Sequence, residues 1–421
     1  MEAFMGYDVI VVGARVAGAA TALLLARSGL KVLVVDRAPA GSDTISSHQV
    51  QVPGIARLAR WGLLDALVRA GTPATREVRF DGDGTVLRGS FPAYDGVDAL
   101  YSPRRTVLDA LLVDAARAAG AEVIDGFRVE ELTAEGGRVT GVRGRARGGT
   151  ALLTYSARLV VGADGKHSTV ADAVGAARYR QRPALAFASY SYWSGVPVTV
   201  GEMYQRPGRA VAVFPTNGDL TMVYVAAPLP SFAGARADLE GHYLATLDRC
   251  GDLGERVRAG TRVERLRTTP DQPNGFRAAH GPGWALVGDA GAVMDSVTAQ
   301  GITNALVDAE LLAHSIVDGL TRGRLDAALA RRQRERDRGL RAMYDLTVSL
   351  ARFAPPSLGQ RQLLAAIADR PAEVSRFLGM FAGMESPARY FGAPNALRIL
   401  GARGVGRLAR RLATARLCTE S

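Results

Sequence analysis

Three short segments of the chain combine glycines with an acidic residue, and they lie far apart in the sequence. Residues 13–18 read Gly-Ala-Arg-Val-Ala-Gly and are followed at a distance by Asp36, residues 162–165 read Gly-Ala-Asp-Gly, and residues 288–291 read Gly-Asp-Ala-Gly. Glycines allow a backbone to approach a pyrophosphate closely, and a carboxylate at the end of a strand accepts hydrogen bonds from ribose hydroxyls. Together the segments predict one long nucleotide bound by distant parts of the chain.

The first segment lies in a pattern typical of a dinucleotide-binding βαβ unit. Residues 8–12 predict a buried strand, residues 16–28 have apolar side chains at helical spacing, and residues 31–35 predict a second buried strand that ends at Asp36. The amide groups at the start of the helix would bind phosphate. Arg15 stands where the common fingerprint has its middle glycine. A glycine-bounded turn that binds nothing is the alternative, and the complete strand–helix–strand pattern with its acid argues against it.

The other two segments are ambiguous when each is taken alone, because such sequences also form ordinary turns. Both follow predicted buried strands, at residues 159–162 and 284–287. The third is followed by residues 298–304, which begin a helix predicted over residues 301–317. The positive end of that helix would stabilise the negative charge that a flavin ring gains at N1 and O2 on reduction.

The remaining patterns predict an α/β fold, α+β overall, with a second region of antiparallel sheet. Helices are predicted over residues 55–70 and 106–119, a hairpin meander between residues 127 and 161, and aromatic-rich strands between residues 183 and 267 with a hairpin turn at residues 215–219. From residue 325 to the end the pattern is helical. The predicted domains are a nucleotide-binding domain of residues 1–75, 101–180 and 270–340, a β-sheet substrate-binding domain of residues 76–100 and 181–269, and a helical C-terminal region of residues 341–421.

The composition argues against several classes of function. The net charge of +11 comes from scattered arginines, with Lys31 and Lys166 as the only lysines, and no groove-reading motif accompanies it, so nucleic-acid binding is not expected. Cys250 and Cys418 are the only cysteines and cannot form a disulfide framework, and the five histidines show no metal-ligand spacing. No secretion signal is evident, and no run of about eighteen apolar residues predicts an integral membrane span. A cytoplasmic protein without a metal site is therefore expected.

The order of the three motifs resembles that of the FAD-dependent group A flavoprotein monooxygenases, the p-hydroxybenzoate hydroxylase-like family. The resemblance implies a Rossmann-type FAD-binding domain with an inserted antiparallel β-sheet substrate domain and a helical C-terminal part. It also implies that NAD(P)H reduces FAD, that O₂ adds at the flavin C4a, and that one oxygen atom passes, by hydroxylation or epoxidation, to a hydrophobic small molecule, aromatic or polyene, in specialised metabolism. Geranylgeranyl reductases and flavin halogenases share the wider fold.

The resemblance assigns roles to individual residues. Asp36 binds the adenosine ribose, Arg105 reaches the phosphate or ribityl region, Asp164 lies near the pyrophosphate and in a site shared with NAD(P)H, and Asp289 bonds the ribityl hydroxyls. A solvated helix start is the alternative for Arg105. The predicted FAD-binding residues are Gly13, Ala14, Arg15, Val16, Ala17, Gly18, Asp36, Arg37, Ser47, Arg105, Val129, Asp164, Asp289, Gly301, Ile302 and Thr303, of which the last three face the flavin pyrimidine edge.

His48 and a set of large apolar side chains are the candidates for substrate contact. His48 falls in the loop beside the predicted isoalloxazine and would bind a substrate hydroxyl or assist proton transfer, and a histidine held by loop backbone is the alternative. Alternating large side chains in the substrate domain would line an apolar pocket, with plain sheet packing as the alternative. A basic helix around residues 403–416 is interpreted as a solvated face rather than a membrane contact. The predicted substrate-binding residues are Tyr192, Tyr204, Phe214, Met222 and Tyr224.

The chain departs from the family near the flavin. Ala292 and Ser296 occupy the places where the family has a histidine and a proline, and Ala171 replaces an arginine at the end of the Asp-Gly motif. These differences leave open a non-oxygenating FAD enzyme, either a cyclase that uses FAD structurally or a saturating reductase. A halogenase is less consistent with the sequence, because neither Lys31 nor Lys166 falls in the substrate domain. Electrons would come from NAD(P)H directly or through a separate flavin reductase, and the sequence assigns no oligomeric state.

Overall fold

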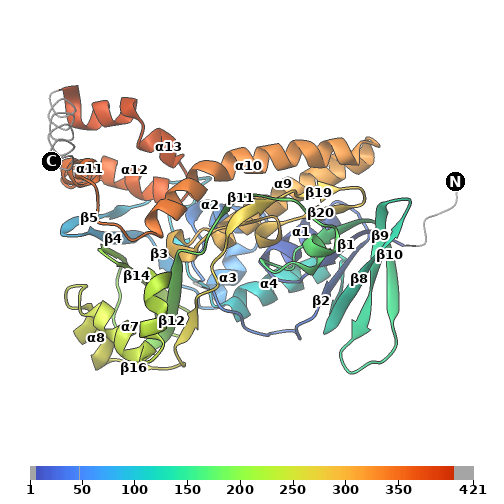
Figure 1. The fold of residues 1–421 in the computed structure, drawn as a ribbon, viewed down its shortest axis with the longest axis horizontal. Helices are drawn as coiled ribbons and strands as arrows, with labels where there is room; N and C mark the ends of the chain where they lie inside the picture. Colours follow the sequence, from blue (N-terminus) through green and yellow to red (C-terminus); the bar gives the residue numbers. More distant parts are fainter. Residues whose placement is uncertain (1–5, 47, 403–421) are drawn as a thin grey trace.

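The nucleotide-binding part of the molecule is built on a parallel sheet that the first βαβ unit begins. A computed structural model describes residues 6–46 and 48–402 (Figure 1). The strand order is β19-β20-β10-β1-β2-β7, and all of these pairs except β19 with β20 are parallel. The strands are β1 (Tyr7–Val12), β2 (Val32–Asp36), β7 (Glu122–Asp125), β10 (Leu153–Gly162), β19 (His280–Gly281) and β20 (Trp284–Leu286).

Both faces of the parallel sheet are buried, which explains the unbroken apolar runs of its strands. Val9 and Val11 of β1 belong to the core beneath three helices, α1, α4 and α9. Ile10 and Val12 belong to the opposite core, which the β8–β9 hairpin and α5 cover. The C-terminal ends of the strands share one edge, where nucleotides bind in open sheets of this kind. The bounds are α1 (Val16–Arg27), α4 (Arg105–Ala118), α5 (Thr169–Ala173), α9 (Gly301–Thr321), β8 (Phe127–Glu135) and β9 (Arg138–Ala146).

A second sheet carries the aromatic residues. Its strand order is β16-β12-β15-β14-β13-β4-β5, with β17 also paired to β12, and only β13 with β4 is a parallel pair, so the sheet is mixed rather than wholly antiparallel. One face carries Tyr190, Tyr192 and Tyr224 toward the main core, and the other, with Trp193 and Tyr204, packs against α7 and α8. The bounds are β4 (Glu77–Gly82), β5 (Thr85–Ser90), β12 (Ala186–Ser194), β13 (Gly201–Arg206), β14 (Arg209–Thr216), β15 (Leu220–Pro228), β16 (Thr261–Arg262), β17 (Arg267–Thr269), α7 (Leu239–Leu247) and α8 (Leu253–Ala259).

Two small sheets connect these parts. β3 pairs with β6, and β18 pairs with both β11 and β21. The antiparallel pairing of β18 with β21 brings residues 272–274 beside residues 294–296, because these segments adjoin the paired strands. The bounds are β3 (Ala74–Thr75), β6 (Leu100–Tyr101), β11 (Arg178–Arg182), β18 (Asn274–Arg277) and β21 (Ala292–Val293).

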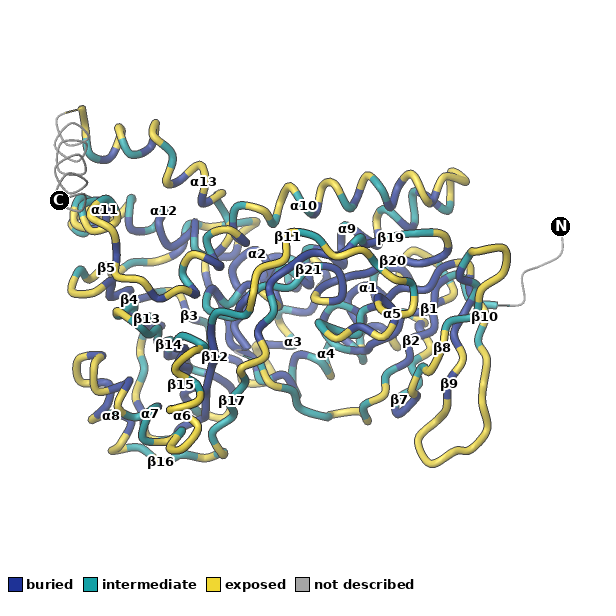
Figure 2. Tube along the Cα trace, in the orientation of Figure 1, coloured by how far each residue is buried: buried dark blue, intermediate teal, exposed yellow. Residues whose placement is uncertain are grey.

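Helices from the last part of the chain cover one end of the second sheet (Figures 1 and 2). Phe377 packs edge-on against Phe80 of β4, with ring centroids 5.3 Å apart, and Gly89 of β5 leaves room for Val374. Across residues 6–46 and 48–402, no helix combines the length and apolar character needed to cross a membrane. The basic segment predicted at residues 403–416 lies outside the described residues. The helices are α10 (Leu325–Leu350), α11 (Leu358–Ile367), α12 (Pro371–Phe381) and α13 (Pro387–Tyr390).

The predicted fold class is confirmed, and two local predictions were wrong. The helix predicted over residues 55–70 is two helices, α2 (Val52–Arg60) and α3 (Leu64–Arg69), because Gly62 between them has a φ of 74°. Between β15 and β16 the chain forms α6 (Phe232–Ala235), α7 and α8, which are only four, nine and seven residues long and so too short to stand out from strands. α10 runs through residue 340, so the domain boundary predicted there falls inside a helix.

Candidate functional site

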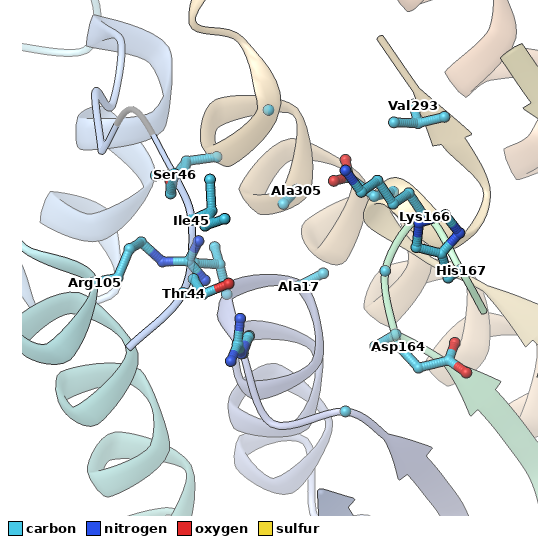
Figure 3. A pocket seen from close by; sticks show the side chains of 18 of the residues that line it. Ala17, Thr44, Ile45, Ser46, Arg105, Asp164, Lys166, His167, Val293 and Ala305 are labelled. Atoms are coloured by element: carbon cyan, nitrogen blue, oxygen red, sulfur yellow. The ribbon is translucent and has the colours of Figure 1, made fainter. Parts of the chain in front are cut away.

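A cavity of about 1010 Å³ lies between the C-terminal edge of the parallel sheet and the aromatic face of the second sheet. Figure 3 shows Thr44, Ile45 and Ser46 with Arg105 on one side of it and Asp164 on the other. All three glycine–acid segments contribute to its wall, so the structure brings them together. The predicted FAD-binding residues that line it are Gly13, Arg15, Val16, Ala17, Asp36, Arg37, Arg105, Val129, Asp164, Asp289, Gly301 and Ile302.

The turn between β1 and α1 packs tightly against the Asp164 loop and places the start of α1 on the cavity wall. Gly13 has a φ of 110°, and a Cβ on it would lie 2.5 Å from the carbonyl oxygen of Ala163. A Cβ on Gly18 would lie 1.8 Å from the carbonyl oxygen of Gly13, so Gly18 serves close packing of α1 on the turn and does not line the cavity. Arg15 is the N-cap of this 12-residue helix, and its side chain makes no capping hydrogen bond. The first amide groups of α1 therefore remain available to an anion.

Arginines gather at the phosphate end of the cavity. Arg105 donates to both carboxylate oxygens of Asp109, at 3.0 and 2.9 Å, and is 8% exposed, so it is not a solvated helix start. Arg15 and Arg37 line the same cavity. Burial lowers the pKa of the Arg15 guanidinium, and the charges of Arg105 and Arg37 lower it further, against the opposing effect of Asp109 and Asp36. A bound anion would relieve this repulsion.

Asp36 ends β2 at the cavity wall. Its carboxylate accepts hydrogen bonds from the amides of Ala14 at 2.6 Å and Ala38 at 2.8 Å, which fix its orientation. Each oxygen keeps a further lone pair that can accept a ribose hydroxyl. Ala14 therefore acts through Asp36 and does not itself line the cavity. Val129 of β8 lines the same end and provides an apolar surface.

Asp164 lines the cavity and also bonds the first turn of α5, whose N-cap is Ser168. Its carboxylate accepts hydrogen bonds from the Ser168 hydroxyl at 2.5 Å and from the Val170 amide at 3.1 Å. Burial raises the pKa of Asp164, and these hydrogen bonds oppose the rise. Beside it, Lys166 and His167 both contact the Asp271 carboxylate, at 3.0 and 2.6 Å, and line the same cavity.

The N-terminus of α9 opens onto the cavity. The side chain of its N-cap residue, Gln300, donates to the carbonyl oxygen of Phe381 at 2.7 Å instead of capping the helix. A Cβ on Gly301 would meet no atom within 4 Å, so the space before the first turn is open. Thr303 does not line the cavity, because its hydroxyl accepts a hydrogen bond from the Gln51 amide at 2.9 Å. Gly301 and Ile302 are thus the predicted residues that can face a flavin ring.

Asp289 is exposed to the cavity between the N-terminal ends of α1 and α9. Enclosure by the surrounding protein raises the pKa of its carboxyl, and the charges of Lys166 and Arg105 oppose the rise. The groups on the wall match the parts of FAD: an acid for the adenosine ribose, free helix amides with arginines for the pyrophosphate, Asp289 for the ribityl chain, and a second helix N-terminus for the pyrimidine edge. The residues present therefore fit this cofactor.

His48 does not fit the predicted role in proton transfer. It is fully buried, it does not line the cavity, and its ring stacks on that of Tyr192 at 5.5 Å and meets that of Tyr190 edge-on at 5.7 Å. Burial lowers the pKa of His48 to about 3, and the charges of Arg105, Arg104 and Arg267 add to this effect. Among the described residues neither ring nitrogen of His48 has a hydrogen-bond partner, so the ring is held by aromatic packing and not by the loop-backbone contacts given as the alternative. Its predicted neighbour in the site, Ser47, lies outside the described residues.

The buried neutral state of His48 predicts a pH dependence of stability. The unfolded chain takes up a proton near the ordinary pKa of 6.5, and the folded protein only near 3. The unfolded state therefore binds more protons in this window, and stability falls as the pH is lowered from 6.5 toward 3, by at most about 1.4 kcal/mol per pH unit. His48→Asn, which tolerates the φ of 60° and does not titrate, is expected to remove this slope. Urea unfolding across the window measures it, and parallel pH curves for both proteins would contradict the account.

The predicted substrate-binding residues divide into three groups. Tyr224 lines the cavity, and together with Met222 it also lines a smaller adjoining cavity of about 30 Å³. Tyr192 and Phe214 are buried in sheet packing, against His48 and Gly201 respectively. Tyr204 was wrongly predicted: its side chain is on the far face of the sheet, where its hydroxyl donates to Glu202 at 2.5 Å.

Several cavity residues escaped the sequence interpretation. Gln272, Met294 and Thr44 line the wall, but they lie in loops without periodicity, and their residue types are ordinary for loops. Tyr190, in contrast, is one of the alternating large side chains of the substrate domain that were expected to line a pocket; it lines the cavity and accepts a hydrogen bond from the Ser46 amide at 3.2 Å. Ser296 was noted only as a departure from a family pattern, and that departure was the available signal.

Comparisons with known proteins show the family of the chain. The family model described as "FAD binding domain" matches residues 6–347. The chain is 30% identical over 358 residues to 6-methylpretetramide 4-monooxygenase of Streptomyces rimosus, covering 79% of this chain and 82% of that protein. Among solved structures, the flavin-dependent brominase Bmp2 matches with a TM-score of 0.77 and 16% identity, covering 97% and 100% of the two chains. The probable FAD-dependent monooxygenase PqsL of Pseudomonas aeruginosa matches with a TM-score of 0.68 and 22% identity, covering 89% and 99%. The two structural matches show the fold alone.

Proposed function

We propose that this chain, which belongs to the FAD-dependent group A flavoprotein monooxygenase family, inserts one atom of O₂ into a hydrophobic small molecule, aromatic or polyene, in specialised metabolism. The observation that carries the proposal is the single cavity shared by the three nucleotide-binding segments, the start of α9 and the aromatic face of the second sheet. The name of the Streptomyces rimosus relative, 6-methylpretetramide 4-monooxygenase, supports oxygen insertion.

The residues of the cavity would divide the work between binding and chemistry. FAD, when bound, supplies the redox chemistry that activates O₂. The β1–α1 turn and Arg105 hold the pyrophosphate, and Asp36 and Asp289 hold the two polyol regions. The free amides at the start of α9 stabilise negative charge at the pyrimidine edge. Tyr190 and Tyr224 close the opposite side, where they orient an apolar substrate and exclude water.

NAD(P)H is the proposed reductant, and labelled oxygen tests the proposal directly. Purified protein with FAD, NADH or NADPH, ¹⁸O₂ and candidate aromatic substrates should consume nicotinamide and oxygen together and give product heavier by one ¹⁸O atom. Product that forms unchanged without oxygen and nicotinamide would show a cyclase instead, and product heavier by two hydrogens would show a reductase. Activity only with an added flavin reductase would move the source of electrons to that partner.

Arg15 gives a prediction for the pyrophosphate. Because its guanidinium lines the cavity among other cations, Arg15→Gln is expected to weaken FAD binding by about tenfold, the size of one lost charge-assisted hydrogen bond. The salt dependence of FAD affinity should become shallower as well. Fluorescence titration of the FAD-free protein measures both quantities, and riboflavin, which lacks phosphates, should bind both proteins equally. An unchanged FAD affinity and salt dependence would remove Arg15 from the site.

A further inference from the structure

A second, smaller cavity of about 30 Å³ lies beside the main one. The second sheet, the end of α12 and the turn that precedes α9 enclose it. Four residues line both cavities, so the two spaces share one wall, made of Gln49, Tyr224, Ser296 and Ala299. Apolar side chains from the sheet and from α12 form most of the rest, among them Val78, Met203, Ala212, Met222, Leu378 and Phe381.

The size of the small cavity limits what it can hold. In liquid water each molecule takes about 30 Å³, whereas an apolar protein cavity that accepts benzene measures about 150 Å³. A space of about 30 Å³ therefore has room for a very small molecule and not for an aromatic ring.

The wall of the small cavity is uncharged and mostly apolar. None of the described residues that line it carries a charge. The Tyr224 hydroxyl lies 2.7 Å from Ser296 Oγ, which lies 2.5 Å from Gln272 Oε1. The Thr298 hydroxyl lies 2.7 Å from that of Thr347. These hydroxyls are thus already engaged, and a cavity that offers a water few polar partners stays dry and accepts apolar atoms such as xenon.

Ala299 holds its part of the shared wall in a strained conformation. Its φ of 51° and ψ of 40° lie in the left-handed region that favours glycine. It directly precedes Gln300, the N-cap of α9, so the shared wall adjoins the helix start that would face the flavin ring. Strain of this kind persists where the surrounding structure maintains it, often at functional sites.

We propose that the small cavity binds dioxygen and releases it into the main cavity past Ala299. Dioxygen is small, neutral and apolar, which matches the size and the wall of this space. The inference rests on the proposed function for the use of dioxygen, but filling of the cavity requires no turnover. A molecule held beside the place where it reacts meets its partner at a higher effective concentration.

Xenon tests the site because it enters dry apolar cavities and scatters X-rays strongly. A crystal of the FAD-loaded protein under xenon pressure should show a xenon atom in the small cavity. Ala212→Val should abolish that peak, because the added methyl groups fill the space from the sheet. Ala382→Val fills it from the end of α12 and should have the same effect, so the test does not depend on the folding of one variant.

The rate at which dioxygen oxidises the reduced protein tests the supply. FAD-loaded protein is reduced by light, without nicotinamide or substrate, and mixed with dissolved dioxygen. Ala212→Val should lower the second-order rate constant by at least about fivefold, since the locally held dioxygen is lost. Ala210→Val is the matched control and should leave the rate constant unchanged. Ala210 lies on the same face of β14 and is also half-buried, but it lines neither cavity.

Two results would overturn the inference. One is a small cavity that takes up no xenon, for example because a water bound to Gln49 and Gln51 fills it. The other is an Ala212→Val protein that excludes xenon and is still oxidised at the unchanged rate. A protein that meets both expectations but inserts no ¹⁸O would reject the monooxygenase and retain the dioxygen site. Insertion of ¹⁸O by a protein that takes up no xenon would do the reverse.

Discussion

Gly13→Ala is expected to weaken FAD binding by at least about a hundredfold. The added Cβ would lie 2.5 Å from the carbonyl oxygen of Ala163 and 3.1 Å from the amide nitrogen of Asp164, and the φ of 110° is strained for alanine. Relief requires the β1–α1 turn and the Asp164 loop to move apart, which displaces the phosphate-binding amides; strain and lost contacts of about 3 kcal/mol correspond to that factor. Titration of the FAD-free variant with FAD gives the dissociation constant.

The matched control is Gly120→Ala, at the end of α4. Gly120 has a φ of 100°, close to that of Gly13, but a Cβ on it would meet nothing within 4 Å. The backbone strain is therefore similar in the two variants, while only Gly13→Ala crowds the cavity. Equal losses of FAD affinity, or a Gly13→Ala protein that binds FAD normally, would show that the turn does not hold the cofactor.

Asp308→Ala is expected to lower the free energy of unfolding by about 3–5 kcal/mol, the usual cost of leaving a buried charge without its partner. The side chains of Asp308 and Arg332 are 6% and 1% exposed and form an ion pair. Asp308 also accepts a hydrogen bond from the Gly288 amide at 3.0 Å, and Arg332 donates to the Leu286 carbonyl oxygen at 2.8 Å. The pair thus ties α9 and α10 to the Gly-Asp segment, and urea unfolding measures its loss.

Asp318→Ala, on the same helix, is the control for this effect. Asp318 pairs with Arg322 and Arg331, whose side chains are 60% and 58% exposed, so its removal should cost less than about 1 kcal/mol. Replacing Asp308 and Arg332 together with apolar residues should recover part of the lost stability, because no unpaired charge then remains buried. Similar losses for Asp308→Ala and Asp318→Ala would contradict the role given to the buried pair.

Local sequence signals predicted those parts of the fold in which neighbouring residues determine structure. Residues 8–36 form β1, α1 and β2 almost as expected. Two buried strands, a helical period and a terminal acid all occur within about thirty residues, so the local sequence is sufficient to predict them. The turn at residues 215–219 follows from Gly218, which adopts a φ of 74°. The pairing of β13 with β4 could not be predicted from the sequence, because it joins segments more than a hundred residues apart and no local pattern indicates it.

The site divides in the same way. Gly13, Asp36 and Asp289 line one cavity, as expected from residue types that suit a phosphate, a ribose or a ribityl chain at those turns. The face of the sheet on which Tyr204 lies, and the burial of His48 behind Tyr192, depend on tertiary packing that alternation alone does not determine. Ser296 provides a hydroxyl where the related pattern has a proline. This hydroxyl forms hydrogen bonds with both the Tyr224 hydroxyl and the Gln272 side chain.

A crystal structure of the protein grown with FAD tests the central claim most directly. We expect the adenosine ribose at Asp36, the pyrophosphate at the β1–α1 turn, the ribityl chain at Asp289 and the pyrimidine edge at Gly301, all within the cavity. An FAD molecule bound elsewhere, or no bound FAD at saturating concentration, would contradict both the proposed cofactor site and the proposed monooxygenase activity.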